Sequence, residues 1–142
     1  TSLKKKFQIK SWKYPQWFWV YVYNDIKDLR KESDAYDKMI GALRDGENDD
    51  ILGICHTYTR EDTVTHTISK NIGIIRLSVP YLPTHIVSHE VFHAAMGLYR
   101  FHHKDKANFG KHVTPKEEEL AHLYGEMFQE MTHKLYKYKF WN

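Results

Sequence analysis

The segment Val87–Met96, with the sequence VSHEVFHAAM, is the part of this 142-residue chain on which the interpretation of the rest depends. It contains two histidines four residues apart, His89 and His93, and Glu90 directly follows the first. Residues i and i+4 lie one turn apart on the same helix face, so both imidazoles can reach one metal ion while the carboxylate faces its open side. This arrangement is typical of a zinc-dependent hydrolase. Because the chain has 10 histidines, the motif can also arise by chance. The surrounding residues therefore determine whether it is a metal site.

The residues around the motif predict a helix of three to four turns. Pro83 and Thr84 favour a helix start, and Gly97 is typical of a helix end. Apolar side chains fall on most sides of this helix, so we expect it to be largely covered by the rest of the fold. A carboxylate and two imidazoles in such a place destabilise a protein unless a metal or hydrogen bonds satisfy them, which favours the metal-binding interpretation.

The remaining segments predict one α+β domain over residues 1–142, a zincin-like core in which a small, mainly antiparallel sheet of about four strands packs against three helices. We expect the strand over 17–23 to be central and buried on both faces or covered by a helix. The other expected elements are an arm or edge strand over 3–14, a helix from Asn24 or Asp25 to about Arg44 that stops at Gly46, a hairpin of 51–59 with 63–69, and a third run over 72–79.

A further helix is predicted to begin at Thr114–Pro115. Thr114 is the expected N-cap, Pro115 the first helical residue and Glu117 the third-position partner of a capping box. This assignment gives the capping role to Glu117, so Glu118 is available for another role. An acidic first turn is ordinarily explained by the helix dipole alone. A carboxylate from a second helix would also complete a tetrahedral site with one open position for water, and we predict Glu118 as that third ligand.

Composition and charge exclude several other classes of protein. With 21 Lys plus Arg against 18 Asp plus Glu, the formal charge is 21 − 18 = +3, which is weak beside the basic surface of a dedicated nucleic-acid binder. The single cysteine, Cys55, allows no internal disulfide and is expected to be a small buried residue. Neither a signal peptide nor an apolar run of about 18 residues is present, so we expect an intracellular, cytoplasmic protein with no membrane partner.

HEVFH, followed 25 residues after His93 by Glu118 in EEELAHLYG, resembles the zinc metallopeptidases of the gluzincin, or thermolysin-like, clan. It is particularly similar to short phage-encoded metallopeptidases that keep a minimal catalytic core, an origin that would place the protein in the host cytoplasm. The shared second motif comprises Glu118, Ala121 and Gly125. The resemblance implies one catalytic Zn²⁺ with ligands His89, His93 and Glu118, Glu90 as general base, and a peptide or protein substrate. It also implies that Ile72–Val79 is an edge strand that holds an extended peptide.

The sequence departs from that family in two respects and leaves alternatives open. His122 stands where the family has an Asp that orients a ligand, and the chain has little room for the C-terminal donor of larger enzymes, for which Tyr99, His102, His103 and His112 are candidates. In one alternative, His102, His103 or His112 is the third ligand, as in SprT-like proteases that act on DNA-linked proteins. In others, the chain is a non-catalytic binding or regulatory module, or an aromatic-rich nucleic-acid binder with an accidental motif.

Overall fold

Two parallel strands, β2 (Trp17–Tyr23) and β4 (Asn71–Ser78), form the centre of the sheet. They belong to a computed structural model that describes residues 2–41, 50–103 and 115–142. β2 is rich in aromatic and β-branched residues and β4 in isoleucine, and such residues favour a pleated, buried surface. β4 is buried along its whole length because helices pack on both of its faces. The predicted central position of 17–23 is confirmed.

An outer strand flanks each central strand, and both outer pairings are antiparallel. β1 (Leu3–Lys10) pairs with β2, and β3 (Ile54–Thr57) pairs with β4, so the order is β1-β2-β4-β3. Within the described residues, the sheet therefore has four strands and is mixed, with one parallel pairing. β4 contains all of the predicted edge strand Ile72–Val79 except Val79, but it is central, so that prediction is wrong. The edge nearest the motif helix is β3.

The hairpin predicted for 51–59 and 63–69 is also wrong, because β3 pairs with β4 and the loop after it is joined only by an isolated antiparallel bridge between Glu61 and Ile68. In the loop that follows β3, the Asp62 carboxylate accepts hydrogen bonds from the backbone N–H groups of Val64 and Thr65, at 2.8 and 3.0 Å. A side chain that satisfies nearby backbone in this way competes with strand pairing. The side chains of this loop are exposed, so no buried face holds a second strand there.

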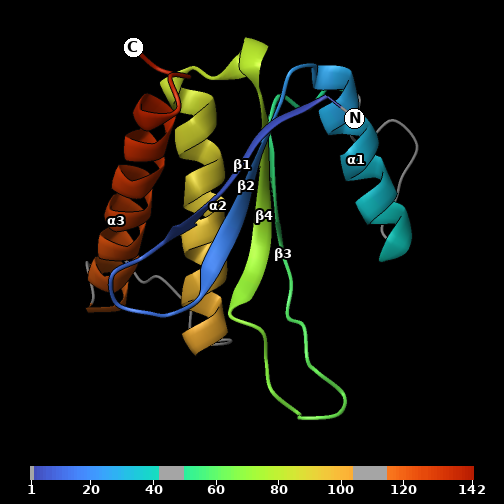
Figure 1. The fold of residues 1–142 in the computed structure, drawn as a ribbon. Helices are drawn as coiled ribbons and strands as arrows, with labels where there is room; N and C mark the ends of the chain where they lie inside the picture. The colour runs from blue at the N-terminus through green and yellow to red at the C-terminus, as the bar shows by residue number, and fades with distance from the viewer. Residues whose placement is uncertain (1, 42–49, 104–114) are drawn as a thin grey trace.

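Three α-helices of the described chain pack on the two faces of the sheet. α1 (Ile26–Met39) lies on one face, and the antiparallel pair α2 (Thr84–His103) and α3 (Pro115–Lys137) lies on the other (Figure 1). A short 3₁₀ turn, η1 (Val79–Tyr81), connects β4 to α2. The predicted α+β class, with about four strands and three helices, is confirmed. The predicted N-cap Thr114 lies outside the described residues.

The two faces of β2 differ in burial. Phe18, Val20 and Val22 are fully buried beneath α2 and α3, within the hydrophobic core. Trp17, Trp19 and Tyr21 alternate with them and are only half-buried on the other face. This period of two is the expected pattern of a strand with one covered face. The prediction that 17–23 is buried on both faces or covered by a helix therefore holds for one face only.

Two helices end at positions other than the predicted ones. α1 ends before Gly41, whose φ of +74° is the left-handed conformation that glycine adopts readily, rather than near Arg44. α2 continues through Gly97 to His103. Gly97 serves packing instead: a Cβ atom there would lie 2.4 Å from Cγ2 of Thr57. The absence of a side chain thus lets the edge strand β3 lie directly against α2.

No helix in the described ranges is both long and apolar enough to cross a lipid bilayer.

Candidate metal centre

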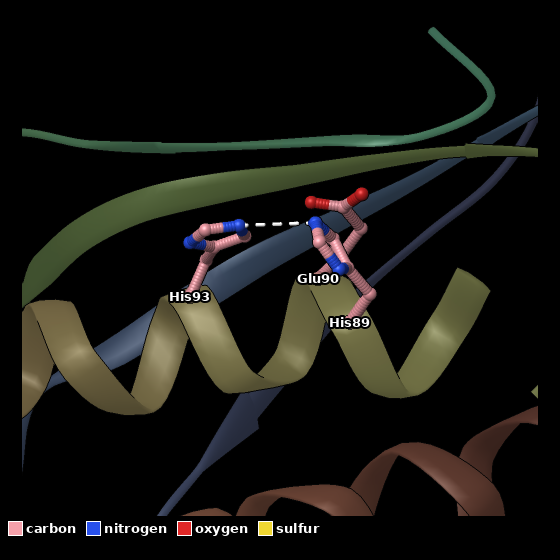
Figure 2. Close-up of side chains that lie close together, drawn as sticks. All are labelled: His89, Glu90 and His93. Atoms are coloured by element: carbon pink, nitrogen blue, oxygen red, sulfur yellow. Dashed lines mark hydrogen bonds between the residues drawn. The ribbon is translucent and has the colours of Figure 1, made fainter. Parts of the chain in front are cut away.

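His89, Glu90 and His93 lie together on α2, as their spacing predicts (Figure 2). One potential ligand atom of each residue lies within 4.8 Å of the others. The two histidines are exposed on one face of the helix, and Glu90 points toward the sheet and is buried, with 6% of its surface exposed. Within the described part of the chain, this is the one cluster of His, Cys, Asp or Glu residues with spacing suited to a metal ion.

The two imidazoles face one another through their Nε2 atoms, which are 3.1 Å apart. Two nitrogens bound at 2.0–2.1 Å in a tetrahedral zinc site are roughly 3.3 Å apart, so the pair fits this ion with little movement. Burial, the neighbouring His89 and the Arg100 guanidinium all hold the pKa of His93 below its ordinary value. A neutral imidazole is the form that binds a metal.

Glu90 is a buried carboxylate beside this pair. Burial raises its pKa to about 7, from an ordinary 4.5. No hydrogen bond or ion pair to its oxygens is found among the described residues. The backbone of Gly53 lies against it, since a Cβ atom at position 53 would be 3.2 Å from Cγ of Glu90. A carboxylate with a pKa near neutrality is suited to accept and return a proton at physiological pH.

The edge strand β3 runs beside the site and turns two side chains toward it. Cys55 and Thr57 line a hollow together with His93, and burial and Glu90 raise the pKa of the Cys55 thiol. The backbone N–H of Tyr58 donates to the carbonyl of Ile72, at 3.0 Å. In an antiparallel ladder such bonds alternate, so the backbone groups of Cys55 and Thr57 point away from β4, toward the free edge.

The opposite side chain of the strand, His56, anchors β3 from behind. Its Nδ1 lies 3.1 Å from Nη1 of Arg76, and its Nε2 lies 3.2 Å from Oδ1 of Asp37. A guanidinium can only donate, so Nδ1 accepts and the proton resides on Nε2, which donates to Asp37. His56 is therefore neutral, consistent with a pKa lowered by burial and by Arg76. His56 is thus a hydrogen-bonded histidine of the sheet and not part of the metal cluster.

The predicted third ligand, Glu118, is not brought to this cluster. Its side chain is 62% exposed and lies 3.3 Å from Nε2 of His122, on a part of α3 beside Lys13. His122, which stands where the resembled family has an Asp that orients a ligand, pairs with Glu118. Adjacent helix positions point about 100° apart, and Glu117 is the residue that lines a hollow with His89.

The other sequence candidates lie at the far end of α2. Nε2 of His102 lies 2.7 Å from Oε1 of Gln16, and Nε2 of His103 lies 2.7 Å from a carboxylate oxygen of Glu119. Tyr99 is fully buried. None of these three belongs to the metal cluster, which removes His102 and His103 as third ligands in this arrangement. His112 lies outside the described residues.

Sequence reasoning missed three features of the site. Arg100 lies two turns after His93 and lines the same hollow, and the i+7 spacing could have identified it. Gly53 makes room for Glu90, and no local signal distinguishes it from a turn glycine. A groove of about 590 Å³ between α2 and α3 adjoins His89 and has apolar walls that include Phe92 and Tyr124. The Tyr124 hydroxyl is hydrogen-bonded to that of Ser88.

Comparison of the chain with models of protein families, with curated proteins and with solved structures found no match. The resemblance to gluzincin metallopeptidases, which rests on HEVFH and on Glu118, Ala121 and Gly125, stays a prediction. The function therefore has to be inferred from the geometry and chemistry of the cluster on α2.

Proposed function

We propose that this chain is a zinc-dependent peptidase whose metal is held by His89 and His93. The observation that carries the proposal is the pairing of two facing imidazoles, 3.1 Å apart at Nε2, with a buried carboxylate that has no donor among the described residues. A zinc ion at this position would supply a bound water of lowered pKa and a Lewis acid for the substrate carbonyl. Such a site needs a general base, and Glu90 is within reach.

In this mechanism, Glu90 accepts the proton of the attacking water and then returns it to the leaving amine. Burial favours its protonated form in the metal-free protein, which supports a role in holding and returning a proton. The outward backbone groups of Cys55 and Thr57 pair with an extended peptide and hold its carbonyl over the site. Arg100, in the hollow beside His93, stabilises the negative charge that develops on the carbonyl oxygen.

The decisive variant is Glu90→Gln, which keeps the shape of the side chain but removes the base. We expect it to retain zinc and to cleave an unfolded protein substrate roughly 10²–10⁴-fold more slowly than wild type. Glu61→Gln, at an exposed loop residue, is the matched control and should leave the rate unchanged. Full activity of Glu90→Gln with bound zinc would refute the assigned role. Zinc binding without turnover of any peptide by wild type would favour a non-catalytic module.

The third ligand is proposed to be a carboxylate from the first turn of α3. The family resemblance assigns Glu118, whereas Glu117 is the residue that lines a hollow with His89. Zinc content of Glu117→Ala and Glu118→Ala separates them, since loss of a ligand lowers affinity far more than loss of a neighbour. If neither variant loses zinc, the third ligand does not come from this turn.

The role of Arg100 has its own measurement. Arg100→Gln should lower kcat by roughly 10²-fold while KM and zinc content stay near those of wild type, because the guanidinium acts on charge that appears in the transition state. A variant that changed only KM would show that Arg100 binds the substrate rather than stabilising the reaction.

A further inference from the structure

One side of β1 and β2 carries aromatic and basic side chains, away from α2 and α3. We name it the Trp–Lys face and define it as Trp17, Trp19 and Tyr21 of β2 with Lys6 and Lys10 of β1. The register places Lys6 opposite Tyr21 and Lys10 opposite Trp17, and residues directly opposite in a ladder share one side of the sheet. The three rings are half-buried, and both lysines are exposed.

This face is partly open. α1 packs on the same side of the sheet, against β4 and β2. Figure 1 shows α1 beside the upper part of the sheet, whereas the lower part, where β2 begins, has no described helix on that side. Contiguous aromatic side chains that reach solvent on one face of a sheet mark a candidate binding surface.

Positive charge is concentrated on β1 and the turn that follows it. Residues 1–24 contain five lysines and no Asp or Glu, a charge of +5, whereas the remaining residues carry 16 basic against 18 acidic side chains, a charge of −2. The overall +3 is the sum of these opposite values. Lys13 is ion-paired with Glu119 at 2.7 Å, but no ion pair is found for Lys6 or Lys10 within the described residues. Both are available to a negatively charged partner.

The rings and the cations are arranged together. Nζ of Lys6 lies 4.1 Å from the ring centroid of Trp19 and 5.5 Å from that of Tyr21. Trp17 and Trp19 are in edge contact, with centroids 4.8 Å apart. Aromatic faces interleaved with lysines on an open sheet match the two parts of a single-stranded nucleic acid, because the bases stack on rings and the phosphates pair with cations.

A second cation–ring pair, Arg60 with Tyr58, extends the face across β4. Arg60 lies over the ring of Tyr58, 4.6 Å from its centroid. The Tyr58 hydroxyl is hydrogen-bonded to the side chain of Asn71, which pairs with Trp17 in the sheet. The aromatic and basic surface is therefore wider than two strands, as a bound chain of several nucleotides requires.

We propose that the Trp–Lys face binds single-stranded nucleic acid without strong sequence preference. The bases stack on Trp19 and its aromatic neighbours, and Lys6 and Lys10 contact phosphates. An acidic peptide would engage the lysines and leave the rings unused, and a duplex would present no free base faces. This binding is separate from the proposed peptidase function, since the metal cluster lies on the opposite side of the sheet.

The test measures fluorescence anisotropy of a labelled oligo(dT) of about 20 nucleotides with the full chain. Lys6→Glu/Lys10→Glu is compared with Lys134→Glu/Lys137→Glu, which makes the same charge change on α3. Trp19→Leu is compared with Trp12→Leu, at the exposed turn between β1 and β2. Far-UV circular dichroism and thermal unfolding establish that each variant is folded.

We expect the Lys6/Lys10 variant to bind at least roughly tenfold more weakly than wild type, with a shallower salt dependence. Trp19→Leu should bind several-fold more weakly. Both control variants should bind nearly as wild type does. Absence of binding at roughly 100 μM protein would overturn the proposal. Equal effects of the two charge variants, equal affinity for duplex, or unchanged binding by folded Trp19→Leu would also overturn it. So would retention on anionic phosphatidylserine vesicles but not on oligonucleotide, which would indicate a membrane-surface site.

Discussion

Histidines lie on both sides of β3, and their hydrogen-bond partners differ. Behind the strand, both ring nitrogens of His56 have protein partners, Asp37 and Arg76, which fix its tautomer. In front of it, His89 and His93 are exposed, and their Nε2 atoms face only one another among the described residues. A histidine that stabilises a fold is satisfied by that fold, whereas the facing pair lies beside a buried Glu90 that has no partner among the described residues, as the proposed metal site requires. The same strand thus separates a structural cluster from a candidate metal site.

The largest effect that would sharpen this contrast comes from Glu90 in the metal-free protein. Its pKa is raised from 4.5 to about 7, so the folded state holds a proton that the unfolded state has lost, and stability falls as pH rises from about 4.5 to 7. The loss is on the order of 3 kcal/mol. Urea unfolding in a chelator at pH 5 and 8.5 should show this loss in wild type but not in Glu90→Gln. Identical pH dependence of the two proteins would show that Glu90 is not held in an unfavourable place.

The contact between β3 and α2 is the next test, since it fixes where β3 lies between the metal cluster on α2 and the His56 cluster behind the strand. Gly97→Ala places a methyl group 2.4 Å from Cγ2 of Thr57 and should lower the free energy of unfolding by about 1–3 kcal/mol. Gly125→Ala is the matched control, because nothing lies within 4 Å of its Cβ position, and it should stabilise α3 by up to about 1 kcal/mol. If Gly97→Ala were as stable as Gly125→Ala, the close approach of β3 would not be a constraint on the fold.

We expect a smaller effect from the cluster of His56, Asp37 and Arg76 behind β3. Asn is too short to join Arg76 to Asp37, so His56→Asn should cost about 1–2 kcal/mol at pH 7.5. Because the pKa of His56 is lowered from 6.5, its contribution is present above pH 6.5 and lost as pH falls below that value. Wild type should therefore lose more stability than the variant on acidification. His66→Asn, at an exposed loop residue, should change stability by less than about 0.5 kcal/mol. If His56→Asn and His66→Asn lowered the free energy of unfolding equally, the contacts of His56 would not hold β3 in place.

Local patterns predicted the elements better than their partners. The aromatic run 17–23 identified the central strand, and the i, i+4 spacing placed His89 and His93 together because both depend on a few neighbouring residues. The hairpin of 51–59 with 63–69 failed because Asp62 folds the loop on itself, and strand partners depend on distant residues. Gly97 looked like a helix end, since its contact with Thr57 comes from 40 residues away in the chain.

The site shows the same division. The helix period located the motif, but the direction of a side chain on a second helix depends on how the two helices pack, so Glu118 was assigned by motif alone. Net charge also misled, because +3 is the sum of a basic N-terminal segment, residues 1–24, and a slightly acidic remainder. The distribution of lysines over residues 1–24 was the signal to read.

The most direct measurement of the central claim is Co²⁺ titration of the metal-free protein, followed by visible absorption, with zinc competition. Wild type should bind one ion with the intense d–d bands of a four-coordinate site, and zinc should displace it. His93→Ala should lose binding by roughly 10²-fold or more, while His56→Asn, behind the strand, should bind as wild type does. Metal binding by His93→Ala equal to that of wild type, or no binding by wild type at all, would contradict the assignment of His89 and His93 as ligands.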